Sequence, residues 1–232
     1  MGRLKLDKHN VLGIGCTHIP YEEPGFLDFC IDTQKENRCG TIVHCGDLVN
    51  NGQIGYHESE PDLKSPKGEM DEAREHLENW YKAFPHLFLT WGNHDLLPQR
   101  KGKTAGLASK HIVSFRKVWD LPNEWKDGFR FVIDGVLYSH GSGYSGKFAA
   151  INFAKDNRMP AVIAHLHSNF GAMFSATHKD CIFGVATGTG VDNNAFEASL
   201  AFSYGRNYKE KPIVGCSVIA HGEDPQMFRM RL

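Results

Sequence analysis

Residues 87–95 read Leu-Phe-Leu-Thr-Trp-Gly-Asn-His-Asp, an apolar run that stops at a glycine and three polar side chains. A short apolar run bounded by turn residues is typical of a buried strand. Two earlier runs have the same design: residues 11–15 precede Cys16-Thr17-His18, and residues 41–45 precede Gly46-Asp47. Because strand ends meet at one edge of an α/β sheet, we expect the polar side chains after these runs to converge.

The second half of the chain repeats this design with histidines. Two strand-like runs flank Asp134-Gly135, a strong hairpin signal, and the second run ends at His140-Gly141. Residues 161–164 form another apolar run, which ends at His165-Leu166-His167. Five strand-like runs therefore end in side chains that can bind metal or transfer protons.

The segments between these runs predict an alternation of helices and strands that begins as a β-α-β unit. Periodicity predicts helices over residues 24–35, 69–84 and 146–157, and one or two short helices within residues 103–119. Residues 51–68 are rich in Gly, Pro, Ser and acids, which favours a long loop. The strand-like segments 181–187, 213–220 and 227–232 are expected to close a second sheet.

Composition predicts one globular domain over residues 1–232, since the chain is 41% hydrophobic and 23% charged. A formal net charge of −1 gives no global attraction to nucleic acid or to an anionic membrane, so any phosphate-binding charge must be local. The sequence shows no secretory signal and no long apolar window, so we expect a cytoplasmic protein without a membrane partner. The six cysteines contain no Cys-x-x-Cys pair, which favours reduced thiols.

The residue types at the strand ends match the needs of a pair of divalent metal ions. Such a pair requires imidazole and hard oxygen ligands, a carboxylate that can bridge both ions, and a nearby acid for the leaving group. The candidate ligands are His18, Asp47, Asn93, His140, His165 and His167, and the candidate acid and its partner are His94 and Asp95.

These motifs, in this order, resemble those of the calcineurin-like metallophosphoesterases, particularly the compact phage or prophage members. That family carries Asp-x-His, Gly-Asp, Gly-Asn-His-Asp, a histidine before glycine, and Gly-His-x-His. The corresponding segments here are Cys16-Thr17-His18, Gly46-Asp47, Gly92-Asn93-His94-Asp95, His140-Gly141 and Ala164-His165-Leu166-His167. The resemblance implies an α/β fold, a four-layer αββα sandwich of two mixed β-sheets flanked by helices.

The resemblance also implies a role for each matched residue, with two divalent ions (Mn, Zn, Fe or Ni) as cofactors. Asp47 would bridge both metals, His18 and His167 would bind the first, and the second would be held by Asn93, His140 and His165. His94 would act as general acid or transition-state stabiliser, oriented by Asp95, while a metal-bridging hydroxide attacks phosphorus in line.

Two positions depart from the family pattern. Ala164 replaces a glycine, which limits the backbone angles available there. Cys16 replaces the opening aspartate. As a thiolate, Cys16 would keep the ligand charge and bias the first site toward zinc or iron. As a neutral thiol, it would leave the first metal weak or absent.

The implied reaction is hydrolysis of a phosphomonoester or phosphodiester. Nucleic acid or a nucleotide is favoured by the phage resemblance, which would place the protein in a host cytoplasm. A basic stretch after the Gly-Asn-His-Asp motif also favours it, although a solvated helix face would explain the same residues: Arg100, Lys101, Lys103, Lys110, Arg116 and Lys117. A phosphoprotein substrate is the alternative, and the rival of another class is a non-catalytic protein-binding module with a degenerate metal site.

Overall fold

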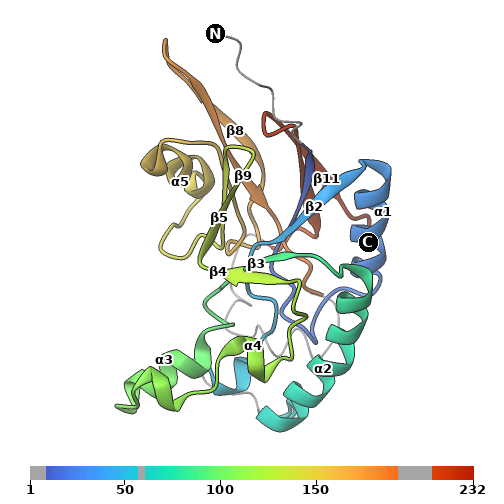
Figure 1. Cartoon of the computed structure of the whole chain (residues 1–232), viewed down its shortest axis with the longest axis vertical. Helices are drawn as coiled ribbons and strands as arrows, with labels where there is room; N and C mark the ends of the chain where they lie inside the picture. Colours follow the sequence, from blue (N-terminus) through green and yellow to red (C-terminus); the bar gives the residue numbers. More distant parts are fainter. Residues whose placement is uncertain (1–8, 57–60, 193–210) are drawn as a thin grey trace.

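The computed structural model describes residues 9–56, 61–192 and 211–232. Two mixed β-sheets face each other, and helices cover their outer faces (Figure 1). This arrangement confirms the predicted four-layer α/β sandwich. Within the described ranges, none of the helices is both long and apolar enough to span a lipid bilayer.

The first sheet has the strand order β11-β10-β1-β2-β3-β4. Its strands are β1 (Asn10–Ile14), β2 (Cys39–His44), β3 (Phe88–Thr90), β4 (Lys126–Gly128), β10 (Gly215–Ala220) and β11 (Asp224–Arg229). The four strands β1 to β4 run parallel, whereas β10 is antiparallel to β1, with Val11 opposite Ile219. The parallel set directs four strand ends to the same edge.

The prediction that segments 213–220 and 227–232 close the second sheet was wrong, because β10 and β11 belong to the first sheet. Strand β1 is buried along almost its whole length and needs a hydrogen-bonding neighbour on each side. The β10–β11 hairpin supplies the second neighbour. Period-2 alternation identifies a strand but does not specify its partner.

The second sheet has the order β5-β6-β7-β9-β8. Its strands are β5 (Arg130–Ile133), β6 (Val136–Ser139), β7 (Ala161–Ile163), β8 (Phe170–Ala176) and β9 (Cys181–Thr187). The predicted hairpin is confirmed: Asp134 and Gly135 both have positive φ, 51° and 82°, as a two-residue turn of the I′ type requires. Strands β4 and β8 were not predicted, since β4 is a polar Lys-Asp-Gly segment and β8 is largely solvent-accessible.

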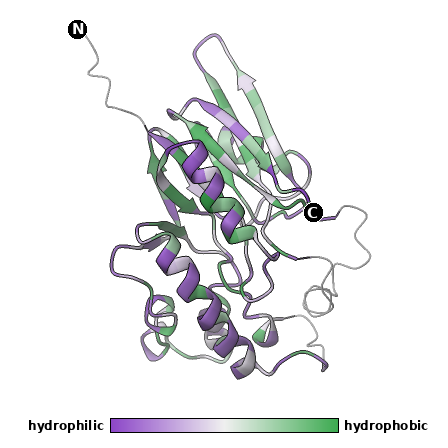
Figure 2. Cartoon of the chain, turned by 90° about the vertical axis from the view of Figure 1, so that its right-hand side faces the viewer, coloured by the Kyte–Doolittle hydropathy of each residue, from purple (hydrophilic) through white to green (hydrophobic). Residues whose placement is uncertain are grey.

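Helices α1 (Phe26–Glu36) and α2 (Pro66–Ala83) cover the first sheet, and α5 (Ala149–Asn157) covers the second (Figure 1). Two shorter helices, α3 (Leu97–Thr104) and α4 (Phe115–Val118), follow β3. Ser65 caps α2 by accepting a hydrogen bond from the Gly68 amide at 3.2 Å, and Pro66 occupies its first position. Figure 2 shows hydrophilic residues along the outward sides of the helices and hydrophobic residues along the strands.

The core follows the alternation of the strands. In β1, Leu12 and Ile14 face the helices and pack in one cluster with Trp80 of α2, whereas Val11 faces the second sheet. Burying a side chain of this size contributes about 1.5–3 kcal/mol. Both faces of β1 are therefore fixed by packing, which fixes the position of the residues that follow it.

Candidate metal centre

The seven predicted metal-ligand side chains all follow strand ends, and the structure brings them together between the two sheets. Strands β1, β2 and β3 run parallel in one sheet, and β6 and β7 run parallel in the other. The ligand candidates follow these strands: Cys16 and His18 after β1, Asp47 after β2, Asn93 after β3, His140 after β6, and His165 and His167 after β7.

Asp47 lies between two groups of these side chains, and one carboxylate oxygen reaches both. Oδ2 is 3.5 Å from His18 Nε2 and 3.2 Å from His140 Nε2. The side chain is buried, and its backbone has a φ of 49°. Gly92 makes room for it, because a Cβ there would lie only 2.1 Å from Asp47 Oδ1. This is the position a bridging carboxylate requires.

The first group contains His18 and His167, whose Nε2 atoms are 3.2 Å apart. His18 Nδ1 lies 3.2 Å from Asn50 Oδ1, an acceptor, so Nδ1 carries the proton and the Nε2 lone pair points to the centre. Metal-binding histidines are commonly oriented by such a contact to their second ring nitrogen.

The second group is arranged around His140. Its Nε2 atom lies 3.0 Å from Asn93 Oδ1 and 3.1 Å from His165 Nδ1. Its Nδ1 atom donates to the Cys45 carbonyl oxygen at 2.9 Å, which fixes the ring orientation. Asn93, His140 and His165 thus present three donor atoms near the Asp47 carboxylate.

Cys16 is placed beside both groups. Its Sγ atom lies within 4.8 Å of the ligand atoms of His18 and His167, and also within 4.8 Å of those of Asp47 and His140. Sγ accepts a hydrogen bond from the His165 backbone amide at 3.3 Å. Burial raises the pKa of the thiol, although the neighbouring His140 charge lowers it in part. A bound cation would favour the thiolate.

The protonation states of these side chains suit the binding of a metal cation. Burial lowers the pKa of His165 and of His167 to about 4 and that of His18 well below its usual value. Burial also raises the pKa of Asp47, but the surrounding histidines outweigh this effect and hold it well below its usual value. Metal ligands must be deprotonated, and this set of neutral imidazoles and a carboxylate fits that need. His140 differs: burial lowers its pKa, but Asp47 and Cys16 reverse this and raise it, so metal binding there would displace a proton.

His94 stands at the edge of the centre with its backbone and its ring both fixed. Its backbone amide donates to Asp47 Oδ1 at 2.7 Å. Its ring Nδ1 lies 2.5 Å from the Asn50 carbonyl oxygen, which can only accept, so Nδ1 is protonated. Nε2 is therefore the ring nitrogen that keeps its lone pair in the neutral imidazole, and the His18 ring packs edge-on against His94 with ring centroids 4.5 Å apart.

Asp95 does not orient His94, contrary to the sequence-based expectation. Its Oδ2 accepts the backbone amides of Asp47 and Gly92, each at 2.8 Å. Its Oδ1 accepts those of Leu48 at 2.9 Å and Val49 at 3.3 Å. The buried Asp95 carboxylate thus fixes the loop that carries Asp47, and the contact to His94 Nδ1 comes from Asn50 instead.

Asn50 and Glu69 belong to the centre but were missed in the sequence. The buried Asn50 contacts His18 through Oδ1 and His94 through its carbonyl oxygen, and it donates to Glu69 Oε2 at 3.1 Å. Tyr21 also donates to Glu69 Oε2, at 3.3 Å. The available signal was Asn50 itself, a polar residue three positions after Asp47. Glu69 gave none, because acids in a first helical turn are common.

Among the described residues, two of the histidines left out of the predicted site have other contacts. His44 is buried, contacts Thr17 Oγ1 at 3.1 Å and packs against Trp80. Its burial lowers its pKa to about 3, so it is a neutral core residue. His76 pairs with Glu22 on the surface. His57 lies outside the described residues.

The match to a family model agrees with this geometry. A family model described as calcineurin-like phosphoesterase matches residues 9–183. A search of curated protein sequences gives no match.

Among solved structures, vacuolar protein sorting 29 from Cryptosporidium parvum is 13% identical, with a TM-score of 0.49, and the match covers 97% of this chain and 92% of that chain. A metallophosphoesterase from Sphaerobacter thermophilus is 14% identical, with a TM-score of 0.48 and coverages of 97% and 89%. The phosphoesterase Yfce from E. coli is 12% identical, with a TM-score of 0.42 and coverages of 96% and 100%. The family match spans most of the chain and includes all the strand ends described above, so the chain belongs to the calcineurin-like phosphoesterase family.

Proposed function

We propose that the chain hydrolyses phosphoester bonds of nucleic acids or nucleotides with two divalent metal ions. The observation that carries this proposal is the Asp47 carboxylate, one oxygen of which contacts a donor atom of each ligand group. His18 and His167 would hold the first ion, and the second would be held by Asn93, His140 and His165. When bound, the ions would lower the pKa of a water molecule and offset the charge of the phosphoryl oxygens.

The residues around the ions would do the rest of the work. Asn50 and the Cys45 carbonyl orient His18 and His140 through their Nδ1 atoms. His94, held through Nδ1, would donate a hydrogen bond or a proton from Nε2 to the leaving oxygen in its doubly protonated form. Its fixed position adjoins the Asp47 carboxylate, so the substrate phosphorus would lie between His94 and the ions.

Cys16 is the residue on which the first ion depends. Its place beside both ligand groups supports a role as a thiolate ligand that favours zinc or iron over magnesium. All six cysteines are free thiols, which is compatible with a reducing cytoplasmic setting. A neutral Cys16 would instead favour the rival function, a protein-binding module with a degenerate metal site.

Release of p-nitrophenol from mono- and bis-p-nitrophenyl phosphate tests the proposal. The protein is stripped with chelator, reloaded with Mn, Zn, Fe, Ni or Mg, and its bound metal is counted by elemental analysis. We expect two ions per chain and activity that falls at least about 100-fold in His94→Ala. His178→Ala, which alters an exposed histidine, is the matched control.

The outcomes separate the alternatives. Inactivity with every metal would refute hydrolysis and favour the binding module. One ion per chain, unaffected by Cys16→Ala, would refute the two-metal centre. Faster turnover of phosphopeptides than of nucleotides would replace the proposed substrate class with phosphoproteins.

A further inference from the structure

The basic stretch after the Gly-Asn-His-Asp motif divides into two parts with different surroundings. Arg116 is a structural residue: its Nε donates to Asp127 Oδ1 at 2.9 Å, and its guanidinium also donates to the carbonyl oxygens of Pro122 and Trp125. All its main donor directions are therefore occupied. Arg116 has no donor left for a substrate.

Arg100 and Lys101 on α3 are less fully paired, since Arg100 has one long contact of this kind, to the Asn93 carbonyl oxygen at 3.5 Å. Among the described residues, neither has a carboxylate within ion-pair distance, and both cations instead lie over the ring of Tyr56. Lys101 Nζ is 4.2 Å and Arg100 Cζ is 5.1 Å from the ring centroid. The Tyr56 hydroxyl lies 3.0 Å from Thr104 Oγ1, which ties its loop to the helix. Tyr56 nevertheless remains 49% exposed.

This group adjoins the metal centre. The Arg100 guanidinium lies 3.5 Å from the carbonyl oxygen of Asn93, at the limit of a hydrogen bond. The Asn93 side chain in turn lies 3.0 Å from His140 Nε2. A substrate whose scissile phosphate sits at the centre would therefore extend its neighbouring groups toward Arg100, Lys101 and Tyr56.

We propose that Arg100, Lys101 and Tyr56 bind the phosphate next to the scissile one, so that single-stranded nucleic acid is the preferred substrate. Unpaired cations bind backbone phosphates, and an exposed aromatic ring offers a surface for an unstacked base. The overall charge of −1 gives no global attraction to a duplex. This inference rests on the proposed hydrolysis, and it adds where the substrate strand binds.

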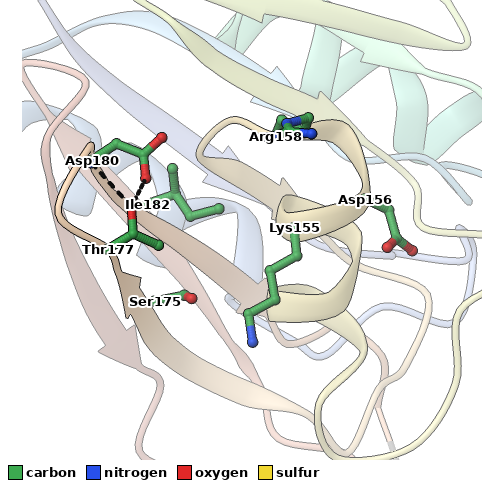
Figure 3. Close-up of a pocket in the computed structure, with 7 residues that line it drawn as sticks. All are labelled: Lys155, Asp156, Arg158, Ser175, Thr177, Asp180 and Ile182. Atoms are coloured by element: carbon green, nitrogen blue, oxygen red, sulfur yellow. Dashed lines mark hydrogen bonds between the residues drawn. The ribbon is translucent and has the colours of Figure 1, made fainter.

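A second pair of cations supplies the control. Lys155 and Arg158 line a hollow of about 410 Å³ between α5 and the β8–β9 hairpin (Figure 3). Residue 158 precedes β7 and residue 180 precedes β9, and these two strands run parallel. The hollow thus lies at the N-terminal ends of strands whose C-terminal ends point to the metal centre, on the opposite edge of the sheet.

The test compares a small diester with a strand. Bis-p-nitrophenyl phosphate has no second phosphate, whereas a ten-residue oligothymidylate has one on each side of most scissile bonds. We expect Arg100→Gln with Lys101→Gln to leave kcat/KM for the small diester within about twofold and to lower it for the oligonucleotide about tenfold per cation at low salt. The slope of log kcat/KM against log salt should flatten by about 0.7 per cation. Tyr56→Leu should lower kcat/KM for the oligonucleotide by about fivefold or more.

Lys155→Gln with Arg158→Gln removes the same number of charges and should leave kcat/KM unchanged for both substrates. Equal effects of the two double variants would overturn the inference, as would an equal loss on both substrates or a greater loss on a phosphopeptide. Binding of a fluorescein-labelled oligothymidylate in chelator, followed by anisotropy, gives a readout that does not need turnover. If the wild type fails to hydrolyse the small diester with any metal, the proposed function fails, while anisotropy that is unchanged by the Arg100 and Lys101 variants refutes the binding site separately.

Discussion

Replacing Asp95 with asparagine should destabilise the folded protein and not merely slow catalysis. The Asp95 carboxylate accepts four backbone amides, two on each oxygen. Asparagine has one acceptor oxygen, so its side-chain NH2 group would face two backbone N–H groups, which cannot accept a hydrogen bond. The two bonds at 2.8 Å, from Asp47 and Gly92, or the pair on the other oxygen would be lost.

The size of the effect follows from the burial of these groups. A hydrogen bond to a charged group contributes about 1.5–3 kcal/mol, and leaving its donor buried without a partner carries the same order of cost. Two lost bonds therefore predict a decrease in the free energy of unfolding of about 4 kcal/mol. For a chain of 232 residues this corresponds to a decrease in Tm of about 8–16 °C.

Urea and thermal unfolding in chelator measure this effect without a contribution from bound metal. Asp71→Asn, which alters an exposed carboxylate on α2 paired with Lys67, is the matched control and should change stability by less than about 0.5 kcal/mol. A loss below about 1 kcal/mol in Asp95→Asn would refute the assignment. If that variant were stable but as inactive as His94→Ala, Asp95 would instead serve the His94 ring.

Three further changes follow from the structure. Gly92→Ala should reduce metal binding and lower the free energy of unfolding by more than about 2 kcal/mol, because its Cβ would lie 2.3 Å from the Asp47 backbone nitrogen; tight metal binding in calorimetric titrations would contradict this. Cys16→Asp should shift bound metal from zinc or iron toward manganese or magnesium, and Cys16→Ala should lower the metal content; elemental analysis that finds all three proteins alike would exclude Cys16 as a ligand. The hydrogen bond to Glu22 raises the pKa of His76, so the pair stabilises the protein most below pH 6.5 and loses this contribution as pH rises through the folded-state pKa. His76→Gln should therefore lower the free energy of unfolding by less than about 1 kcal/mol at pH 5.5 and by almost nothing at pH 8.5. An equal loss at both pH values in urea unfolding would show that the ion pair is not the cause.

The local elements of the fold were largely readable from the sequence. Segment 181–187 is strand β9 as predicted, and the Asp134-Gly135 turn joins β5 to β6. These features depend on alternation and on backbone angles that short sequences encode. The sheet assignment of β10 was not readable, because it depends on contacts between residues about 200 positions apart. Strand β8 was missed because its exposed side chains lack the alternation of a half-buried strand.

The sequence predicted the residues of the candidate centre that directly follow strands. It did not predict the residues that hold those side chains in position. His140 and His165 stand directly at strand ends, so the fold alone brings them close. The role of Asp95 could not be inferred, since a carboxylate beside a histidine in sequence gives no information about which backbone amides it accepts. Asn50 acts through its carbonyl oxygen as well as its side chain, and a sequence pattern does not report carbonyl directions.

Because β1 pairs with β10, the first sheet can be completed only late in synthesis. Val11 pairs with Ile219, so one edge of β1 stays open until residue 219 has left the ribosome. At translation rates of about 5–20 residues per second, this interval is about 10–40 s. Cys16 and His18 follow directly from that unfinished strand. Until residue 219 has emerged, a nascent chain would thus carry the Cys16 thiol and the His18 imidazole without their final neighbours.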